Sequence, residues 1–319
     1  MCITKTFPKL ACALLAAVSF AASAAWPDKP VTLVAPYPPG GNADAMARLV
    51  AQGLSAQLGQ PVIVENKPGA GGMVGSQFVA RANPDGYTFL LGAFSNVLNE
   101  FFYKKRLLDL RRDLVPVSQV ASIPNYFAAG PNTKIETLAD LIRQAKAQPG
   151  RLTCATSGVG TSGHLACEML KQRAGLDILI VPYRGGAPAI TDVIGGHAQF
   201  LAINEVLPYI RDKRLKGLAV TSAHRSPFAP ELPPAADTLP GFELVSWYGV
   251  FAPAGTPPDI VAKLGSAVAG SVKTKDSVER LALLGATPVG SAPKEFSAFM
   301  NAELARWEKI LKPLNISLD

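Results

Sequence analysis

Short apolar runs alternate along this chain with longer segments whose apolar residues recur every three or four positions. Residues 31–35 have the composition of a buried strand and end at a turn rich in proline and glycine. The next segment has the period of a helix, with one apolar face formed by Met46, Leu49, Val50, Leu54 and Leu58. Asn42 is a residue type that caps helix N-termini, and Gly59 is a type that ends helices. With further strands at 61–65 and 87–91, residues 31–91 predict a β-α-β-α-β unit with a parallel sheet.

The same alternation resumes after residue 137 and predicts a second sheet. Thr137 precedes an amphipathic segment at 138–145, and further helices are expected at 162–174 and from Pro188. The remaining predicted elements are strands at 152–155, 178–181, 198–203, 217–221 and 245–252 and two late helices, one from 256–257 and one at 294–311.

The two series predict an α/β protein of two lobes, each a mostly parallel sheet flanked by helices. The chain has 319 residues, more than the roughly 250–300 that usually share one core, which agrees with two lobes. The segments 115–120 and 216–221 each join one unit to the next, so we expect two crossings between lobes. Lobe 1 is then predicted to comprise residues 26–122 and 223–319, and lobe 2 residues 123–222, with a hinge and a cleft between them.

The first 25 residues have the three parts of a secretory signal peptide. Lys5 and Lys9 form a positive region, residues 10–20 form an apolar core too short to span a bilayer, and residues 22–24 are small. We therefore expect an exported protein that begins near Trp26 after cleavage.

Composition excludes several classes of function. The formal net charge is +7, from 31 Lys and Arg against 24 Asp and Glu, without the long basic block of a nucleic-acid-binding tail. Cys154 and Cys167 remain after removal of the signal, and the sequence is compatible with either a disulfide or two buried thiols. The three histidines have no close ligand spacing with one another or with these cysteines, so no metal site is predicted, and no cofactor is expected.

Two glycine-rich loops, at 38–44 and 156–164, each connect a predicted strand to a helix. Free N–H groups at a helix start favour an anion, and glycine lets the backbone approach it. The second loop also carries four hydroxyl side chains and a match to the dinucleotide fingerprint, which alone is weak in an exported protein. Both loops follow the carboxyl ends of strands, where open α/β sheets place ligands. We interpret them as the two halves of a site for a small carboxylate, with purely structural turns as the alternative.

The local signatures of common enzymes are missing. The sequence has no G-x-S-x-G elbow, no P-loop and no H-E-x-x-H motif. His164 is the histidine that a catalytic hypothesis would use as a base, and a packing role is its alternative. We expect a binding protein rather than an enzyme.

A series of ordered sequence blocks carries a family resemblance. The blocks are Trp26-Pro27-Asp28-Lys29-Pro30, Pro36-Tyr37-Pro38-Pro39-Gly40-Gly41, Val64-Glu65-Asn66-Lys67-Pro68-Gly69-Ala70-Gly71-Gly72, Asn83-Pro84-Asp85-Gly86-Tyr87-Thr88, Pro116-Val117-Ser118, Val181-Pro182-Tyr183-Arg184-Gly185, Leu218-Ala219-Val220-Thr221-Ser222 and Phe251-Ala252-Pro253-Ala254-Gly255-Thr256-Pro257. In this order they resemble the Bug-type solute receptors of tripartite tricarboxylate transporters over essentially the whole mature chain. The resemblance implies a periplasmic binding protein of type II architecture, whose two α/β lobes close like a flytrap on a small carboxylate.

The resemblance also implies which residues bind the ligand. The loop at 38–44 matches the ligand loop of the first lobe, 157–164 matches that of the second, and Tyr37 has the aromatic position of the first loop. The expected ligand-binding residues are Tyr37, Pro38, Gly40, Gly41, Asn42, Asp44, Ser95, Ser157, Gly158, Thr161, Ser162, His164 and Asn204. Family members hold the carboxylate through backbone N–H groups, hydroxyls and bridging waters, so Arg184 is expected to be solvated.

Two stretches depart from the family pattern. Ile203 stands where family members often have an acid, in a segment about two residues shorter than usual, so an amino-acid ligand is less expected unless Glu205 compensates. In residues 94–102 Glu100 replaces the usual proline, and either Ser95 or Asn96 is expected to reach the cleft.

We therefore predict a monomeric periplasmic receptor that captures a small carboxylated organic solute and delivers it to the permease subunits of a tripartite tricarboxylate transporter. No nucleic acid is expected as a partner. Two alternatives remain at this point: a sensor that reports its ligand to a membrane kinase, and a periplasmic enzyme that acts on a small carboxylate.

Overall fold

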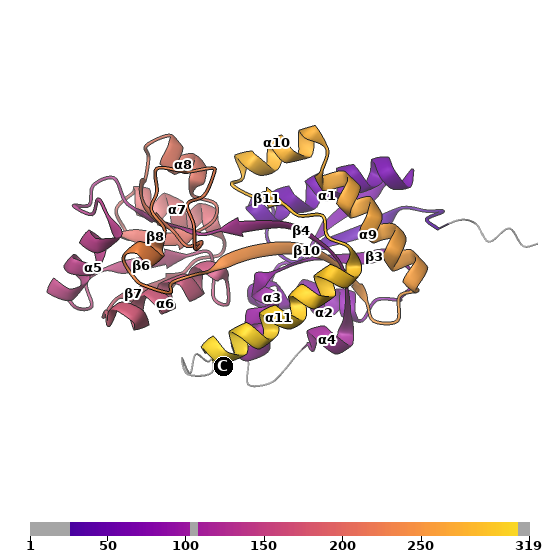
Figure 1. Cartoon of the computed structure of the whole chain (residues 1–319), viewed down its shortest axis with the longest axis horizontal. Coiled ribbons are helices and arrows are strands. Elements are labelled where there is room, and N and C mark those ends of the chain that lie inside the picture. The colour runs from indigo at the N-terminus through magenta and orange to yellow at the C-terminus, as the bar shows by residue number, and fades with distance from the viewer. Residues whose placement is uncertain (1–25, 103–107, 312–319) are drawn as a thin grey trace, which may run out of the picture.

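The strands of the protein form two sheets that lie in two lobes. The computed structural model describes residues 26–102 and 108–311, so the predicted signal peptide and the basic run at 104–106 lie outside the described residues. One sheet has six strands in the order β11-β4-β10-β3-β1-β2, and the other has five in the order β7-β6-β8-β5-β9. Figure 1 shows the lobes side by side, with helices packed around each sheet. The predicted two-lobed α/β architecture is confirmed.

Lobe 1 is built around the six-stranded sheet. Its elements are β1 (Val31–Ala35), α1 (Asn42–Leu58), β2 (Val62–Asn66), η1 (Ala70–Gly72), α2 (Met73–Ala80), β3 (Thr88–Ala93), α3 (Phe94–Phe102), α4 (Leu110–Asp113), β4 (Leu114–Pro124), β10 (Val245–Pro253), α9 (Pro258–Val272), α10 (Lys275–Leu283), β11 (Thr287–Pro288) and α11 (Pro293–Leu311).

Lobe 2 is built around the five-stranded sheet. Its elements are β5 (Tyr126–Ala129), α5 (Leu138–Ala147), β6 (Thr153–Thr156), α6 (Ser162–Ala174), β7 (Leu179–Pro182), α7 (Gly186–Ile194), β8 (Phe200–Ile203), α8 (Leu207–Arg211) and β9 (Lys216–Val220), and the short helix η2 (Ala235–Asp237) lies on the return to lobe 1.

Both sheets combine a parallel part with antiparallel crossing strands. In lobe 1, β1 pairs in parallel with β2 and β3, as the β-α-β-α-β pattern predicts, and in lobe 2 β6 pairs in parallel with β7 and β8. The long strands β4 and β10 pair antiparallel with each other, because one runs toward lobe 2 and the other returns from it (Figure 1). Each sheet is therefore mixed, where the periodicity alone predicted mostly parallel sheets.

The chain passes between the sheets twice. Asn125 alone separates the end of β4 from the start of β5, and the return runs from the end of β9 to the start of β10. Both passages lie C-terminal to the segments predicted for them, 115–120 and 216–221, which belong to strands β4 and β9. An apolar run identifies a strand but does not show where the strand leaves its sheet. The predicted lobe boundaries at residues 122 and 222 stay a prediction.

Local sequence signals predict some of the helix ends correctly and one of them wrongly. Thr137 and Asp140 form a reciprocal capping box at the start of α5, and Gly59 ends α1 in the left-handed conformation. The predicted cap Asn42 is wrong: Gly41 is the N-cap of α1, and Asn42 is its first helical residue. Asn42 does not cap the helix because its side chain forms a hydrogen bond with Asn204 of the other lobe.

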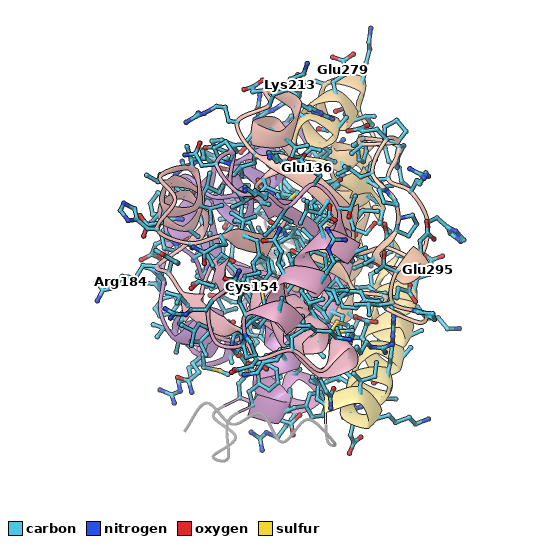
Figure 2. All side chains as sticks on the ribbon, turned by 90° about the vertical axis from the view of Figure 1, so that its left-hand side faces the viewer. Glu136, Cys154, Arg184, Lys213, Glu279 and Glu295 are labelled. Atoms are coloured by element: carbon cyan, nitrogen blue, oxygen red, sulfur yellow. A yellow bond between two sulfur atoms is a disulfide. The ribbon has the colours of Figure 1, made fainter. Side chains whose placement is uncertain are left out.

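A disulfide joins Cys154 of β6 to Cys167 of α6, with their Cα atoms 6.5 Å apart. The sequence left open whether these residues form a bridge or stay as thiols. Cys154 lies in the interior of lobe 2 (Figure 2), and the bridge ties the strand before the second glycine-rich loop to the helix after it. The loop is thereby closed at its base.

Candidate functional site

A cavity of about 710 Å³ lies between the lobes and is lined by residues of both. Its walls come from residues 36–41, 68–72, 157–159 and 183–188, together with Ala43, Ala93, Ser95, Asn125, Thr161, Ser162, Asn204, Glu205, Ser246 and Tyr248. A second cavity of about 750 Å³ is lined by lobe 2 residues that include Lys134 and Arg143, and it contains neither predicted loop. The interlobe cavity is therefore the candidate site.

Four helices begin at this cavity, and backbone N–H groups at the starts of three of them, α1, α6 and α7, give it a positive potential. The N-caps of α1, α6 and α7 are Gly41, Thr161 and Gly185, and all three line the cavity. Neither Gly41 nor Gly185 supplies a side-chain cap, so first-turn N–H groups of α1 and α7 are left for a ligand or water. Since one helix belongs to lobe 1 and two to lobe 2, an anion held there contacts both lobes.

The helix α2 also begins at the cavity, but its first N–H groups are already used. Met73 and Val74 donate to the carbonyl groups of Ala70 and Gly69 in the preceding turn. Residues 68–72 therefore contribute wall and shape rather than free donors. This loop meets the second lobe, because a Cβ atom on Gly71 would lie 3.0 Å from the carbonyl oxygen of Val159.

Asp44 supports the first loop from behind and is not among the residues that line the cavity, so its expected contact with a ligand stays a prediction. Its Oδ2 accepts hydrogen bonds from the Gly40 N–H at 3.1 Å and from Arg48 at 3.0 Å, and its Oδ1 accepts one from Asn66 at 3.0 Å. Burial alone would raise the pKa of Asp44, but these hydrogen bonds lower it overall. The carboxylate thus fixes the position of Gly40, which lines the cavity with a φ of 90°.

A hydrogen-bonded pair of hydroxyls forms the lobe 1 wall. Tyr37 Oη and Ser95 Oγ are bonded to each other, and both residues line the cavity. Burial raises the pKa of Tyr37 to about 12, so its hydroxyl stays neutral. The structure also decides between Ser95 and Asn96: the Asn96 side chain is used internally, accepting from the Ala93 N–H and donating to Ser76.

The second loop presents hydroxyls and a glycine backbone to the cavity, as predicted. Ser157, Gly158, Thr161 and Ser162 all line it. Gly158 has a φ of 138°, which side chains rarely allow, and its carbonyl accepts a hydrogen bond from Thr161 Oγ1 at 2.8 Å. The hydroxyl protons of Thr161 and Ser162 are used in hydrogen bonds within the protein, so this loop offers a ligand the Ser157 hydroxyl and backbone N–H groups at the start of α6.

Asn125, at the first crossing between lobes, is a cavity residue that sequence reasoning missed. Its Oδ1 accepts a hydrogen bond from Ser162 Oγ at 3.1 Å, while its buried Nδ2 has no hydrogen-bond partner among the described residues. A buried donor without a partner is costly unless a ligand or water accepts from it. Asn125 therefore adds a donor at the hinge side of the cavity.

His164 lies in the first turn of α6 and is not among the residues that line the cavity, so its expected contact with a ligand stays a prediction. Its backbone N–H donates to Thr161 Oγ1 at 3.3 Å, and its imidazole is buried, with Nε2 3.9 Å from Glu168 Oε1. Burial lowers the pKa of His164, so the ring is held neutral. The imidazole is therefore buried in lobe 2 instead of facing the cavity.

Asn42 and Asn204 meet in the interlobe seam, where residues 40–42 of lobe 1 face residues 204–205 of lobe 2. Asn42 Nδ2 lies 3.2 Å from Asn204 Oδ1, and the Asn204 side chain also hydrogen-bonds to Tyr248. Asn204 lines the cavity, whereas Asn42 is not among the lining residues, and its expected contact with a ligand stays a prediction. Its role is to connect the lobes.

The loop at 183–188 and Glu205 are further parts of the wall that the predicted set did not include. Gly185 and Gly186 before Pro188 repeat the strand–glycine–helix pattern that identified the first two loops, so the signal was present. Arg184 lines the cavity rim with an exposed side chain that points away from the molecule in Figure 2, in agreement with its expected solvation. Burial raises the pKa of the Glu205 carboxyl to about 7.

The described residues show no metal centre and no membrane span. Nowhere in residues 26–102 and 108–311 do three or more His, Cys, Asp or Glu side chains gather to hold a metal ion. Within the same ranges, none of the helices is both long and apolar enough to cross a bilayer.

Comparison of the sequence and the structure with known proteins shows the family of this chain. The sequence model described as "Tripartite tricarboxylate transporter family receptor" matches residues 46–316. The protein BugT of Bordetella pertussis is 36% identical over 303 residues, covering 92% of this chain and 91% of BugT. Rpa4515 of R. palustris, solved with adipate, superposes with a TM-score of 0.87 at 35% identity, covering 92% of this chain and 99% of that one. MatC of Rhodopseudomonas palustris, solved with bound malate, gives 0.84 at 30% identity, covering 89% and 99%.

Proposed function

The chain belongs to the tripartite tricarboxylate transporter receptor family, as its sequence motifs predicted, and we propose that it captures a small carboxylated organic solute in the interlobe cavity. It is a periplasmic solute-binding receptor of the Bug type. Two similar structures hold adipate and malate, both of which carry carboxylates. That chemistry fits the donors found in this cavity.

The observation that carries the proposal is the convergence of three helix starts on one cavity. The N-caps of α1, α6 and α7 line it from both lobes, and the hydroxyl of Ser157 lies in the same wall. Backbone N–H groups and hydroxyls of this kind stabilise a carboxylate without a cationic side chain. A ligand bound to both lobes stabilises the closed form, because only that form offers it all donors.

Closure is also how the receptor would pass its solute to permease subunits of a membrane transporter. A permease that docks on both lobes distinguishes the closed, loaded receptor from the open one. The proposed role is binding without catalysis, since the histidine considered as a base has its ring outside the cavity wall.

Isothermal titration of the purified receptor with adipate and malate tests the proposal, after unfolding and refolding to remove any solute carried from the cell. We expect binding of a carboxylate, and no binding of the matching dimethyl ester. Ala187 is exposed at the start of α7 and lines the cavity, so Ala187→Trp should block binding without disturbing the core. Ala147→Trp places the same side chain on the exposed end of α5 and is the matched control.

Two results would count against the proposal. If the Ala187→Trp variant still binds the carboxylate, the binding site lies elsewhere. If the refolded receptor binds no carboxylate of a broad panel, the proposed function is wrong. Delivery to a permease is tested by uptake of labelled solute in cells with and without the receptor gene, where we expect uptake to require the receptor.

A further inference from the structure

Asn125 forms the first crossing between the lobes by itself, since it is the single residue between β4 and β5. Its backbone N–H donates to Thr221 Oγ1 at 2.9 Å, and its carbonyl oxygen accepts from the Thr221 N–H at 2.9 Å. Thr221 follows β9 at the second crossing, and its carbonyl oxygen accepts from the N–H of Leu244, the residue before β10, at 2.8 Å. The two crossings are therefore hydrogen-bonded into one hinge, where β4 and β10 reach lobe 2 (Figure 1).

The side chain of this hinge residue lies in the wall of the interlobe cavity. Its Oδ1 accepts a hydrogen bond at 3.1 Å from the Oγ of Ser162, the first residue of α6 in lobe 2. Its Nδ2 is a donor, yet it is buried and has no partner among the described residues. Because Asn125 is 0% exposed, an acceptor for this donor has to come from inside the cavity.

The bond from Ser162 determines which end of the Asn125 amide is offered to the cavity. Ser162 Oγ donates, so Oδ1 is the end that is already bonded and Nδ2 is the end that is left unpaired. The buried amide of Asn96 differs, because both of its ends are bonded within lobe 1. An unpaired buried donor costs free energy until an acceptor binds to it. An acceptor atom of a molecule in the cavity is therefore stabilised at Asn125.

We propose that Asn125 couples the bound solute to the hinge, because one acceptor atom of the solute bonds to Nδ2 and thereby holds the crossing in its closed geometry. The inference rests on the proposed function and adds the residue through which an occupied cavity acts on the hinge.

The position of Asn125 distinguishes it from the other donors of the cavity. Donors at the start of α1 belong to lobe 1, whereas Ser157 and the starts of α6 and α7 belong to lobe 2, so each moves with its own lobe. Asn125 belongs to the segment whose backbone angles change when the lobes rotate. A ligand shifts a conformational equilibrium only through contacts that differ between the two forms, and the geometry of a contact to the hinge changes with the angle between the lobes.

Two substitutions of Asn125 test its contact with the solute. Asn125→Asp keeps the size of the side chain and the bond from Ser162 but replaces the donor with an acceptor, and Asn125→Ala removes both. Titration calorimetry at pH 8 uses adipate or malate, whichever the wild type binds more tightly. We expect at least about a tenfold loss of affinity for Asn125→Asp, because a carboxylate then faces the carboxylate solute, and about a two- to tenfold loss for Asn125→Ala. Asn132→Asp makes the same charge change at an exposed position of lobe 2, and its affinity should stay within about twofold of wild type.

Closure is measured separately, as the decrease in the radius of gyration by small-angle scattering when the same probe saturates the receptor. Asn125→Ala is expected to contract less than wild type even at saturation, since the bound solute no longer holds the hinge. Ser157→Ala is the matched control: it removes a cavity donor outside the hinge, so it should contract fully once saturated. Thermal unfolding checks that each variant is folded, and if one of the two Asn125 variants does not fold, the other carries both measurements.

The outcomes separate this inference from the proposed function. If the Asn125 variants bind like Asn132→Asp and contract like wild type, Asn125 has no such role, and the carboxylate receptor stands. If affinity falls but the saturated variants contract fully, Asn125 is an ordinary contact and the coupling is wrong. If the wild type binds no carboxylate of a broad panel, the proposed function fails, and this inference fails with it.

Discussion

Asn42 of α1 donates its side-chain amide across the interlobe seam to Asn204, with Nδ2 3.2 Å from Oδ1 and 3.4 Å from the backbone carbonyl oxygen. Both residues are buried, and they belong to different lobes. Asn204 in turn bonds to Tyr248 on the crossing strand β10. The two lobes are therefore joined by a polar connection made by the protein itself.

Asn42→Ala is expected to shift the ligand-free receptor toward its open form. The variant loses a buried hydrogen bond of about 0.5–1.5 kcal/mol, so affinity should fall roughly two- to tenfold as closure becomes less favourable. Small-angle scattering without ligand should show a larger radius of gyration than wild type. Asn301→Ala, at an exposed position of α11, is the control. An unchanged radius and unchanged affinity would show that the bond does not influence closure.

Glu205→Gln is expected to stabilise the fold at pH 8 and to have little effect at pH 4. The folded-state pKa of Glu205 is about 7, above its ordinary value of 4.5, so ionisation is costlier in the folded protein. The wild type therefore loses stability as pH rises from about 4.5 to 7, by on the order of 1–3 kcal/mol. Chemical unfolding at a series of pH values measures the difference, with Glu231→Gln expected to follow the wild-type profile. A constant difference between Glu205→Gln and wild type at all pH values would contradict the buried, unpaired carboxyl.

Loss of the Cys154–Cys167 bridge is expected to destabilise the receptor by about 3 kcal/mol, the chain-entropy value for a loop of this length. The bonded residues are separated by 13 positions, and the bridge encloses the second ligand loop. Guanidinium unfolding of the oxidised protein, the reduced protein and a Cys154→Ala/Cys167→Ala double variant measures the effect. Two titratable thiols in the oxidised receptor, unfolded without reductant, would show that the bridge does not form.

His164→Ala is expected to lower stability but to leave ligand affinity within about twofold of wild type, because the imidazole is buried outside the cavity wall. Ser157→Ala should do the opposite, with little change in stability and an affinity loss of about fivefold from one hydroxyl contact. Thermal unfolding and calorimetry on both variants give the comparison. If a stable His164→Ala protein no longer bound the ligand, His164 would have to take part in binding. If the wild-type receptor converted its bound solute into a product, the catalytic hypothesis would be supported.

The fold class, the family and several of the helix ends could be predicted from the sequence alone. Residues that cap or end a helix, such as Thr137 and Gly59, form hydrogen bonds with residues only a few positions away. The spacing of the apolar residues indicates which face of a helix or strand is buried. The two predicted loops line the cavity for the same reason: strand, glycine and helix start are neighbours in the chain.

Which side chains of those loops face the cavity depends on contacts between distant parts of the chain. Asp44 bonds back to Gly40 behind the first loop, the His164 side chain is buried in lobe 2, and Asn42 reaches the opposite lobe instead of capping its own helix. Glu205 enters the site because the connection after β8 places it against the starts of α1 and α7. Such directions depend on how helices pack on a sheet and how two lobes close, and these contacts join residues far apart in sequence.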